Sequence, residues 1–180
     1  QFEIINPITF ASRDELVKCL HSKRKEKGLS YEEADELAKD PYYFGTLLVE
    51  CGYADGMVAG AEASTANTVR PALQIVKANK KGGVVSSCFI MYGKNNFLGE
   101  KCLVLADCGV IKNPNEDELY QIAYQSVETY KSLGFNDPKV AFLSYSTKGS
   151  ADDEKLQSIK NAYNKFKKTG IVCDGEIQFD

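Results

Sequence analysis

Apolar residues in the second half of the chain recur at the spacing of helices. Between residues 119 and 133 they follow one another at steps of three and four, which predicts a helix with one apolar face. We expect Asn113 to cap this helix, because an asparagine side chain can accept a hydrogen bond from a backbone N–H of the first turn. Residues 156–166 repeat the pattern, and Ser150 with Asp153 is expected to start that helix.

The first half carries four shorter helical segments, each with its own start signal. They are residues 12–27, started by Ser12 and Glu15; residues 30–39, started by Ser30 and Glu33; residues 41–50, with Pro41 at the first helical position; and residues 71–77, opened by Pro71.

Short apolar runs between and around these helices predict strands. They are residues 2–5, 57–59, 84–92, 102–106 and 140–143, and a last strand that begins at 171–173 and still alternates polar and apolar residues over 176–180. The run at 57–59 is expected to be a buried strand. Strands that alternate with helices are typical of an α/β fold with a mostly parallel sheet and flanking helices.

Composition narrows the class of protein. The 180 residues are 43% hydrophobic and 26% charged, as in an ordinary globular protein. The net charge of −3 argues against nucleic-acid binding, and no apolar run has the length of a membrane span. The single histidine, His21, lies in a polar helical segment, so neither a Cys/His catalytic pair nor a zinc site is expected. We interpret the six irregularly spaced cysteines as small buried hydrophobes in a reducing cytosol.

Three loops rich in hydroxyl residues follow the predicted strands. They are residues 60–71, the segment around Ser86 and Ser87, and residues 144–150. Ligands bind beyond the carboxyl ends of strands in open α/β sheets, which makes these loops candidate sites. The loop at 144–150 leads into a predicted helix, where backbone N–H groups and hydroxyls favour an anion. The alternative is that its residues only cap the helix and form the turn.

Charged side chains give further candidates. Arg70 precedes the helix predicted from Pro71, and its guanidinium is suited to bidentate hydrogen bonds with phosphate. The alternative is that Arg70 is a surface arginine without a binding role. The basic run at residues 23–27 either forms a solvated helix face or binds an anionic ligand. Asp107 is either a general base or a residue that shapes a turn.

Seven segments, taken in order, resemble the successive signatures of the phosphate acetyltransferase (phosphotransacetylase) family. They are Asp40-Pro41-Tyr42-Tyr43-Phe44-Gly45-Thr46, Ala54-Asp55-Gly56-Met57-Val58-Ala59-Gly60-Ala61, Arg70-Pro71-Ala72-Leu73-Gln74-Ile75, Val85-Ser86-Ser87-Cys88-Phe89, Ala106-Asp107-Cys108, Leu143-Ser144-Tyr145-Ser146-Thr147 and Asp174-Gly175-Glu176-Ile177-Gln178. The resemblance covers nearly all of the chain.

The resemblance implies an enzyme that moves an acetyl group between acetyl phosphate and coenzyme A. The coenzyme A thiolate is expected to attack the acyl carbon directly, with no covalent enzyme intermediate, no metal and no permanently bound cofactor. The implied fold is similar to that of isocitrate and isopropylmalate dehydrogenases, with two subdomains around a cleft and a change of subdomain near residues 70–85. A cytoplasmic homodimer is expected, with coenzyme A, acetyl phosphate and phosphate as partners and no nucleic acid or membrane.

The resemblance also carries binding roles onto seven positions. Arg24 and Arg70 are expected to hold the phosphate groups of coenzyme A or acetyl phosphate. The residues whose hydroxyl groups are expected to line the site are Ser64, Thr65, Ser86, Ser144 and Thr147.

Both ends of the chain fall within predicted strands, and the family's general base and transition-state arginine belong to a segment beyond Asp180. We therefore interpret residues 1–180 as an incomplete phosphate acetyl/butyryl transferase-type region, inactive alone. The second interpretation is that the chain is the transacetylase-like domain of a malic enzyme, which senses acetyl-CoA without catalysis. A phosphate butyryltransferase, which differs in the size of its acyl pocket, is a third interpretation.

Overall fold

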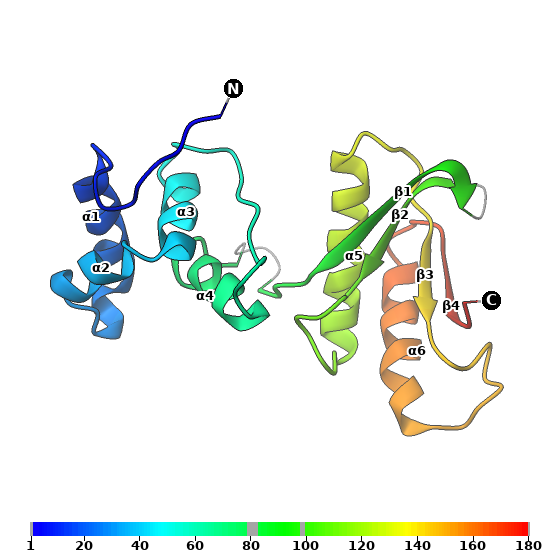
Figure 1. The fold of residues 1–180 in the computed structure, drawn as a ribbon. Helices are drawn as coiled ribbons and strands as arrows, with labels where there is room; N and C mark the ends of the chain where they lie inside the picture. Colours follow the sequence, from blue (N-terminus) through cyan, green and yellow to red (C-terminus); the bar gives the residue numbers. More distant parts are fainter. Residues whose placement is uncertain (1, 79–82, 98–99, 180) are drawn as a thin grey trace. The chain divides into compact units, whose positions relative to one another are not determined.

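The computed structural model describes residues 2–78, 83–97 and 100–179. The chain divides into two compact units, Gln1–Ala78 and Asn79–Asp180, whose elements are labelled in Figure 1. Asp180, the end of the last predicted strand, and residues 79–82, within the predicted change of subdomain, lie outside the described residues.

The first unit is built from helices. They are α1 (Arg13–Arg24), the short 3-10 helix η1 (Lys25–Lys27), α2 (Tyr31–Leu37), α3 (Pro41–Glu50) and α4 (Thr65–Ile75). The strands predicted at residues 2–5 and 57–59 are wrong, since neither segment pairs with a neighbouring strand among the described residues. Val58, expected to be buried, is fully exposed.

Helices of the first unit begin where a side chain satisfies a free backbone N–H group. The capping box predicted at Ser30 is confirmed, because its hydroxyl accepts from the N–H of Glu33 at 3.1 Å and its own N–H donates to the Glu33 carboxylate at 2.8 Å. Asp40 caps α3, and Pro41 takes the first helical position as predicted. The capping box predicted at Ser12 is wrong, since its backbone is not extended and its side chain makes no capping bond.

The prediction that Pro71 opens a helix is also wrong. Ser64 caps α4 by accepting a hydrogen bond from the N–H of Asn67 at 3.3 Å, so the helix begins at Thr65 and already contains Pro71. This earlier start places Ser64, Thr65 and Arg70 on one helix.

The core of the first unit joins α1, α2, α3 and α4. Its buried residues are Leu16, Val17, Leu20, Ala34, Ala38, Tyr43, Phe44, Leu47 and Ile75. Phe10, before α1, meets the ring of Phe44 edge-on with centroids 5.5 Å apart. The packing therefore fixes α3 and α4, which carry Tyr43 and Arg70, against each other.

The second unit is mixed α/β, as predicted. Its elements are β1 (Cys88–Phe97), β2 (Glu100–Ala106), α5 (Glu116–Ser132), β3 (Val140–Leu143), α6 (Glu154–Lys167) and β4 (Cys173–Ile177). Strands β1 and β2 pair antiparallel, whereas β3 and β4 pair parallel. The described residues thus form two small sheets rather than one mostly parallel sheet. The connection between β1 and β2 is too short for a parallel crossover, while α6 supplies that crossover between β3 and β4.

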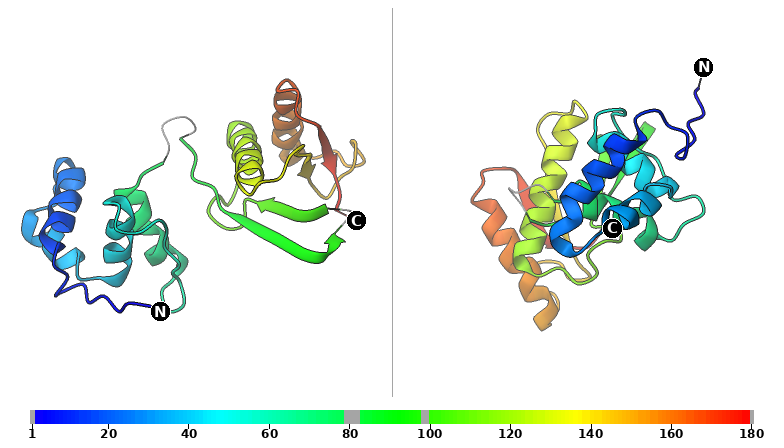
Figure 2. Two further views of the ribbon diagram at one scale, coloured as in Figure 1. Left: turned by 90° about the horizontal axis from the view of Figure 1, so that it is seen from above. Right: turned by 90° about the vertical axis from the view of Figure 1, so that its left-hand side faces the viewer.

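Helices α5 and α6 pack side by side, with α6 against β4 of the parallel pair and α5 against β2 of the antiparallel pair (Figures 1 and 2). Their shared core contains Ala123, Val127, Phe142, Ala162 and Phe166, which confirms the apolar helix faces read from the sequence. No helix in the described ranges has the length and apolar character that a membrane span requires.

Two helix starts in this unit differ from the prediction. Asn115, not Asn113, caps α5, because its side-chain oxygen accepts from the N–H groups of the first turn and Glu118 completes a capping box. Asp153, not Ser150, caps α6. Both true caps are nearer to the first apolar residue of the helix, and the hydroxyl of Ser150 is instead used inside the preceding loop.

Candidate functional site

Tyr43 is a residue whose ionisation is affected by both candidate arginines, Arg24 and Arg70. It is buried on α3, 9% exposed, and its phenol donates to the side-chain oxygen of Gln74 at 2.8 Å. Burial raises the pKa of Tyr43, and the positive charges of Arg70 and Arg24 oppose that rise. Both guanidinium groups therefore lie close enough to the Tyr43 phenol to affect its pKa.

Neither Arg24 nor Arg70 forms a salt bridge with a carboxylate in the part of the first unit that the structure describes. Two other cations of this unit are paired, since Arg13 binds Asp35 and Lys23 binds Glu50. Arg24 is half-buried at the end of α1 and Arg70 is exposed on α4. Two guanidinium groups without a carboxylate partner among the described residues leave positive charge in this unit that can attract an anion.

Ser64 and Thr65 stand at the amino end of α4, and both are exposed. The oxygen of Ser64 accepts the helix-capping bond described above, which leaves its hydroxyl hydrogen free to donate. The N–H groups and the helix dipole make this end favourable for a negative charge. These two hydroxyl residues and Arg70 thus lie on one helix and its cap.

Residues 57–62 line an apolar groove at the start of α3 rather than forming a strand. The groove is lined by Pro41, Tyr42, Met57, Val58, Ala59, Gly60, Ala61 and Glu62. The Tyr42 hydroxyl accepts the N–H of Ala63 at 3.1 Å, which ties the loop to α3 just before the cap of α4. The groove therefore lies beside the amino end of α4.

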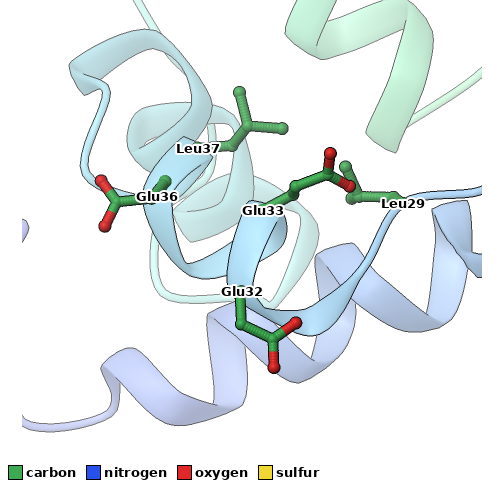
Figure 3. A pocket seen from close by; sticks show the side chains of 5 residues that line it. All are labelled: Leu29, Glu32, Glu33, Glu36 and Leu37. Carbon is green, nitrogen blue, oxygen red and sulfur yellow. The ribbon is translucent and has the colours of Figure 1, made fainter.

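A second groove of this unit has the wrong charge for the predicted ligands. Figure 3 shows its lining, which consists of Leu29, Glu32, Glu33, Glu36 and Leu37. The Glu33 carboxylate completes a capping box and Glu36 pairs with Lys39. Three carboxylates around one groove repel phosphate groups, so we do not assign it to the predicted site.

The loop at residues 144–150 in the second unit is already satisfied by groups of the chain. Ser144 donates to the carbonyl of Ser146 at 2.6 Å and accepts the N–H of the same residue at 2.9 Å. The N–H of Gly149 donates to the carboxylate of Glu176 at 2.6 Å. An internal carboxylate thus occupies a loop N–H group that the sequence suggested for an external anion.

Thr147 differs from the other hydroxyl residues of this loop. Its oxygen accepts the N–H of Gln178 at 3.0 Å, while its hydroxyl hydrogen has no acceptor among the residues that the structure describes. The residue is exposed. Of the two predicted binding residues in this loop, Thr147 therefore has a free donor, whereas the Ser144 hydroxyl is bound within the loop.

Ser86 and Asp107 belong to another hydrogen-bonded cluster of the second unit. Ser86 is half-buried and donates to the carbonyl of Ser87 at 3.4 Å. Asp107 accepts from the N–H and hydroxyl of Ser87, and from the N–H groups of Gly109 and Val110. Burial raises the pKa of Asp107, but these bonds outweigh it and lower the pKa far below its usual value. The geometry favours a turn-shaping role for Asp107 over a general base.

The cysteines and the histidine offer no evident nucleophile. Cys102 is buried as expected, whereas Cys88 is exposed on β1. Burial and the neighbouring Cys19 thiol raise the pKa of Cys51 to about 12, which leaves little thiolate at neutral pH. His21 contacts the ring of Tyr31 edge-on. Within the described ranges, no three His, Cys, Asp or Glu residues gather in a group able to hold a metal ion.

The sequence identified the arginines and the loop at 144–150 as candidates but missed one contact in each unit, that of Tyr43 with Gln74 and that of Glu176 with Gly149. Tyr43 and Glu176 both lie inside segments that carry the family resemblance, yet no local signal predicts their partners, which are 31 and 27 residues away. The general base was expected beyond Asp180, outside the described residues.

The first unit is helical and the second is mixed α/β. Among the described residues, Arg24 and Arg70 of the first unit and the Thr147 hydroxyl of the second are polar groups available to an anionic ligand. The chain belongs to the family described as phosphate acetyl/butaryl transferase, which matches it over residues 1–180.

Named relatives agree with this family. The phosphate acetyltransferase of Thermoanaerobacterium thermosaccharolyticum is 44% identical over 99% of this chain and 55% of its own length. That of Helicobacter pylori (strain J99) is 44% identical over 99% of this chain and 34% of its own length. The chain thus spans between a third and about half of these curated relatives.

Two solved structures of phosphotransacetylases are also similar to this chain. The chain is similar to a phosphotransacetylase from Streptococcus pyogenes, with a TM-score of 0.85 and 40% identity over all of this chain and 54% of that one. It is also similar to the EutD phosphotransacetylase from Staphylococcus aureus, with a TM-score of 0.81 and 37% identity over the same shares.

Proposed function

We propose that the protein transfers an acetyl group between acetyl phosphate and coenzyme A. The observation that carries this proposal is the family match over the whole chain, together with 44% identity to relatives named phosphate acetyltransferase. The unpaired Arg24 and Arg70 support it, because both substrates carry phosphate groups and guanidinium groups bind phosphate strongly. The fold of the whole protein is proposed to be similar to that of isocitrate and isopropylmalate dehydrogenases.

The proposed reaction needs charge neutralisation more than a protein nucleophile. The coenzyme A thiol gives its proton to the general base expected beyond Asp180, and the thiolate sulfur forms a bond to the acyl carbon while the bond from that carbon to the phosphate oxygen breaks and inorganic phosphate leaves. Negative charge grows on the departing phosphate, where positively charged and hydroxyl donors lower the barrier. The chain's cysteines are not required as nucleophiles, in keeping with the raised pKa of Cys51.

Seven residues of the chain are proposed to bind the substrates or to shape the loops around them. Arg24 and Arg70 hold phosphate oxygens of coenzyme A or acetyl phosphate, and Ser64 with Thr65 adds donors at the amino end of α4. Thr147 donates its free hydroxyl hydrogen to a ligand. The remaining two assigned residues, Ser86 and Ser144, contribute through the loops that they shape, since their hydroxyls are engaged within the chain.

The relatives and structures do not favour the alternative of a sensing domain without catalysis, because their names are those of acetyl-transferring enzymes. We further propose a homodimer in the cytoplasm, with no permanent cofactor and no nucleic-acid or membrane partner. Six unpaired cysteines are typical of a reducing compartment, and a net charge of −3 does not suit nucleic acid.

The test is thioester formation from coenzyme A and acetyl phosphate by the product of the complete gene, beside this 180-residue chain. We expect the complete protein to form acetyl-CoA and to use butyryl phosphate more slowly. Binding of acetyl-CoA without transfer from either phosphate would support the sensing domain and contradict the proposal.

A further inference from the structure

Glu176 on β4 is a charged residue whose side chain is almost wholly buried, 4% exposed. Its Oε1 atom accepts the N–H of Gly149 at 2.6 Å and the hydroxyl of Ser146 at 3.3 Å. Its backbone carbonyl accepts the N–H of Lys148 at 2.9 Å. The ammonium nitrogen of Lys160, on α6, lies 3.9 Å from the same Oε1 atom. One residue of β4 thus holds three positions of the loop at 144–150.

Stability alone does not explain a carboxylate at this position. Removing a carboxylate from water is costly unless hydrogen bonds and a counter-charge compensate for the lost hydration. An apolar residue of similar volume would complete a strand without that cost. What the Glu176 carboxylate adds is an acceptor at a fixed point of a strand for the N–H of Gly149 and the hydroxyl of Ser146.

The residue that this arrangement holds is Thr147. It stands between Ser146 and Lys148, both of which bind Glu176. Its oxygen accepts the N–H of Gln178, just beyond β4. With its backbone and its oxygen both fixed by β4 and the residue after it, the Thr147 hydroxyl hydrogen has a limited range of directions.

We propose that Glu176 is a positioning residue for the transfer reaction, holding the loop so that the Thr147 hydroxyl donates to a phosphate oxygen of acetyl phosphate. This inference rests on the function proposed above. Glu176 itself lies inside the unit and does not touch the substrate. Its effect on the reaction passes through Thr147.

The first experiment compares Glu176→Gln with Glu128→Gln in the product of the complete gene. Glu128 is an exposed carboxylate on α5 of the same unit and serves as the matched control. We expect Glu176→Gln to raise the KM for acetyl phosphate about tenfold, because a neutral amide oxygen accepts the Gly149 N–H more weakly than the carboxylate does and no longer pairs with Lys160. The KM for coenzyme A should be unchanged, and Glu128→Gln should match the wild type. Equal kinetics for the two variants would overturn the proposal.

Hydrogen exchange reports on the loop itself. The Gly149 amide donates to the side chain of Glu176, whereas the Lys148 amide donates to its backbone. Glu176→Gln should therefore speed exchange at Gly149 more than at Lys148. An unchanged Gly149 amide would contradict the proposed hold on the loop.

A double-mutant cycle with Thr147→Val separates positioning from general loss of structure. If Glu176 acts through Thr147, the double variant should be no slower than the slower single variant. Losses that multiply would overturn the proposal. If Glu176→Gln does not fold, Ser146→Ala, which removes one hydroxyl donor to the carboxylate, takes its place in the cycle.

The two proposals fail differently. A wild-type protein without thioester formation would refute the transfer function, and this inference with it. An active wild type with an equally active Glu176→Gln variant would refute the positioning role alone.

Discussion

The phenol of Tyr43 on α3 donates a 2.8 Å hydrogen bond to the side-chain oxygen of Gln74 on α4. Gln74 and Arg70 are four residues apart on α4, so their side chains lie on the same helix face. The bond therefore joins α3 to the face of α4 that carries Arg70.

Tyr43→Phe removes this bond while keeping the ring in the core. We expect the free energy of unfolding to fall by about 0.5–1.5 kcal/mol, because the half-buried Gln74 oxygen loses its donor. Urea unfolding measures the change. The control is Tyr31→Phe, whose ring contacts His21 and whose hydroxyl makes no hydrogen bond to the described residues. Equal unfolding curves for wild type and Tyr43→Phe would show that the bond contributes nothing to the packing of α3 on α4.

Asp107→Asn should destabilise the second unit by about 1–3 kcal/mol at neutral pH, because the amide nitrogen cannot accept the bonds that the carboxylate accepts. The lowered pKa of Asp107 means that its ionised form stabilises the fold. That contribution is present above the unfolded pKa of about 3.9 and is lost as the pH falls through the folded pKa.

The pH dependence of unfolding tests this expectation. The difference in stability between wild type and Asp107→Asn should stay constant from pH 7 to about pH 4 and shrink below it. Asp152→Asn, at an exposed carboxylate, is the control. A difference that persists unchanged at the lowest pH would contradict the role assigned to the charge.

Gly175→Ala tests the close approach of β4 to β3. A Cβ atom at Gly175 would lie 2.7 Å from the Cβ of Phe142, and such overlap in a packed core costs about 1–3 kcal/mol. Gly109→Ala is the control, since a Cβ there meets no atom within 4 Å. Thermal unfolding should show a lower midpoint for Gly175→Ala alone, and a midpoint equal to that of the control would show that the strands lie further apart.

The sequence predicted those features that depend on neighbours along the chain. The capping box of Ser30 with Glu33 and the apolar faces of α5 and α6 each need only residues within a few turns, and all three are confirmed. The α/β class of the second unit follows from the same local patterns.

Features that depend on distant partners were predicted less well. The pairing of β1 with β2 is antiparallel because of their short connection, which the alternation of strands and helices does not reveal. The run at 57–59 is apolar, yet no strand of the described residues pairs with it. Likewise the loop at 144–150 has the composition of an anion site, but Glu176 from β4 occupies one of its N–H groups.

The central claim is that Arg70 holds a phosphate group of the transfer reaction. The most direct measurement is kcat/KM for acetyl phosphate and coenzyme A in Arg70→Ala protein from the complete gene. Lys18→Ala, at an exposed cation on α1, is the control for loss of one positive charge. We predict a loss of about 2–4 kcal/mol in transition-state stabilisation for Arg70→Ala and wild-type values for Lys18→Ala. Unchanged kcat/KM in Arg70→Ala would contradict the assignment.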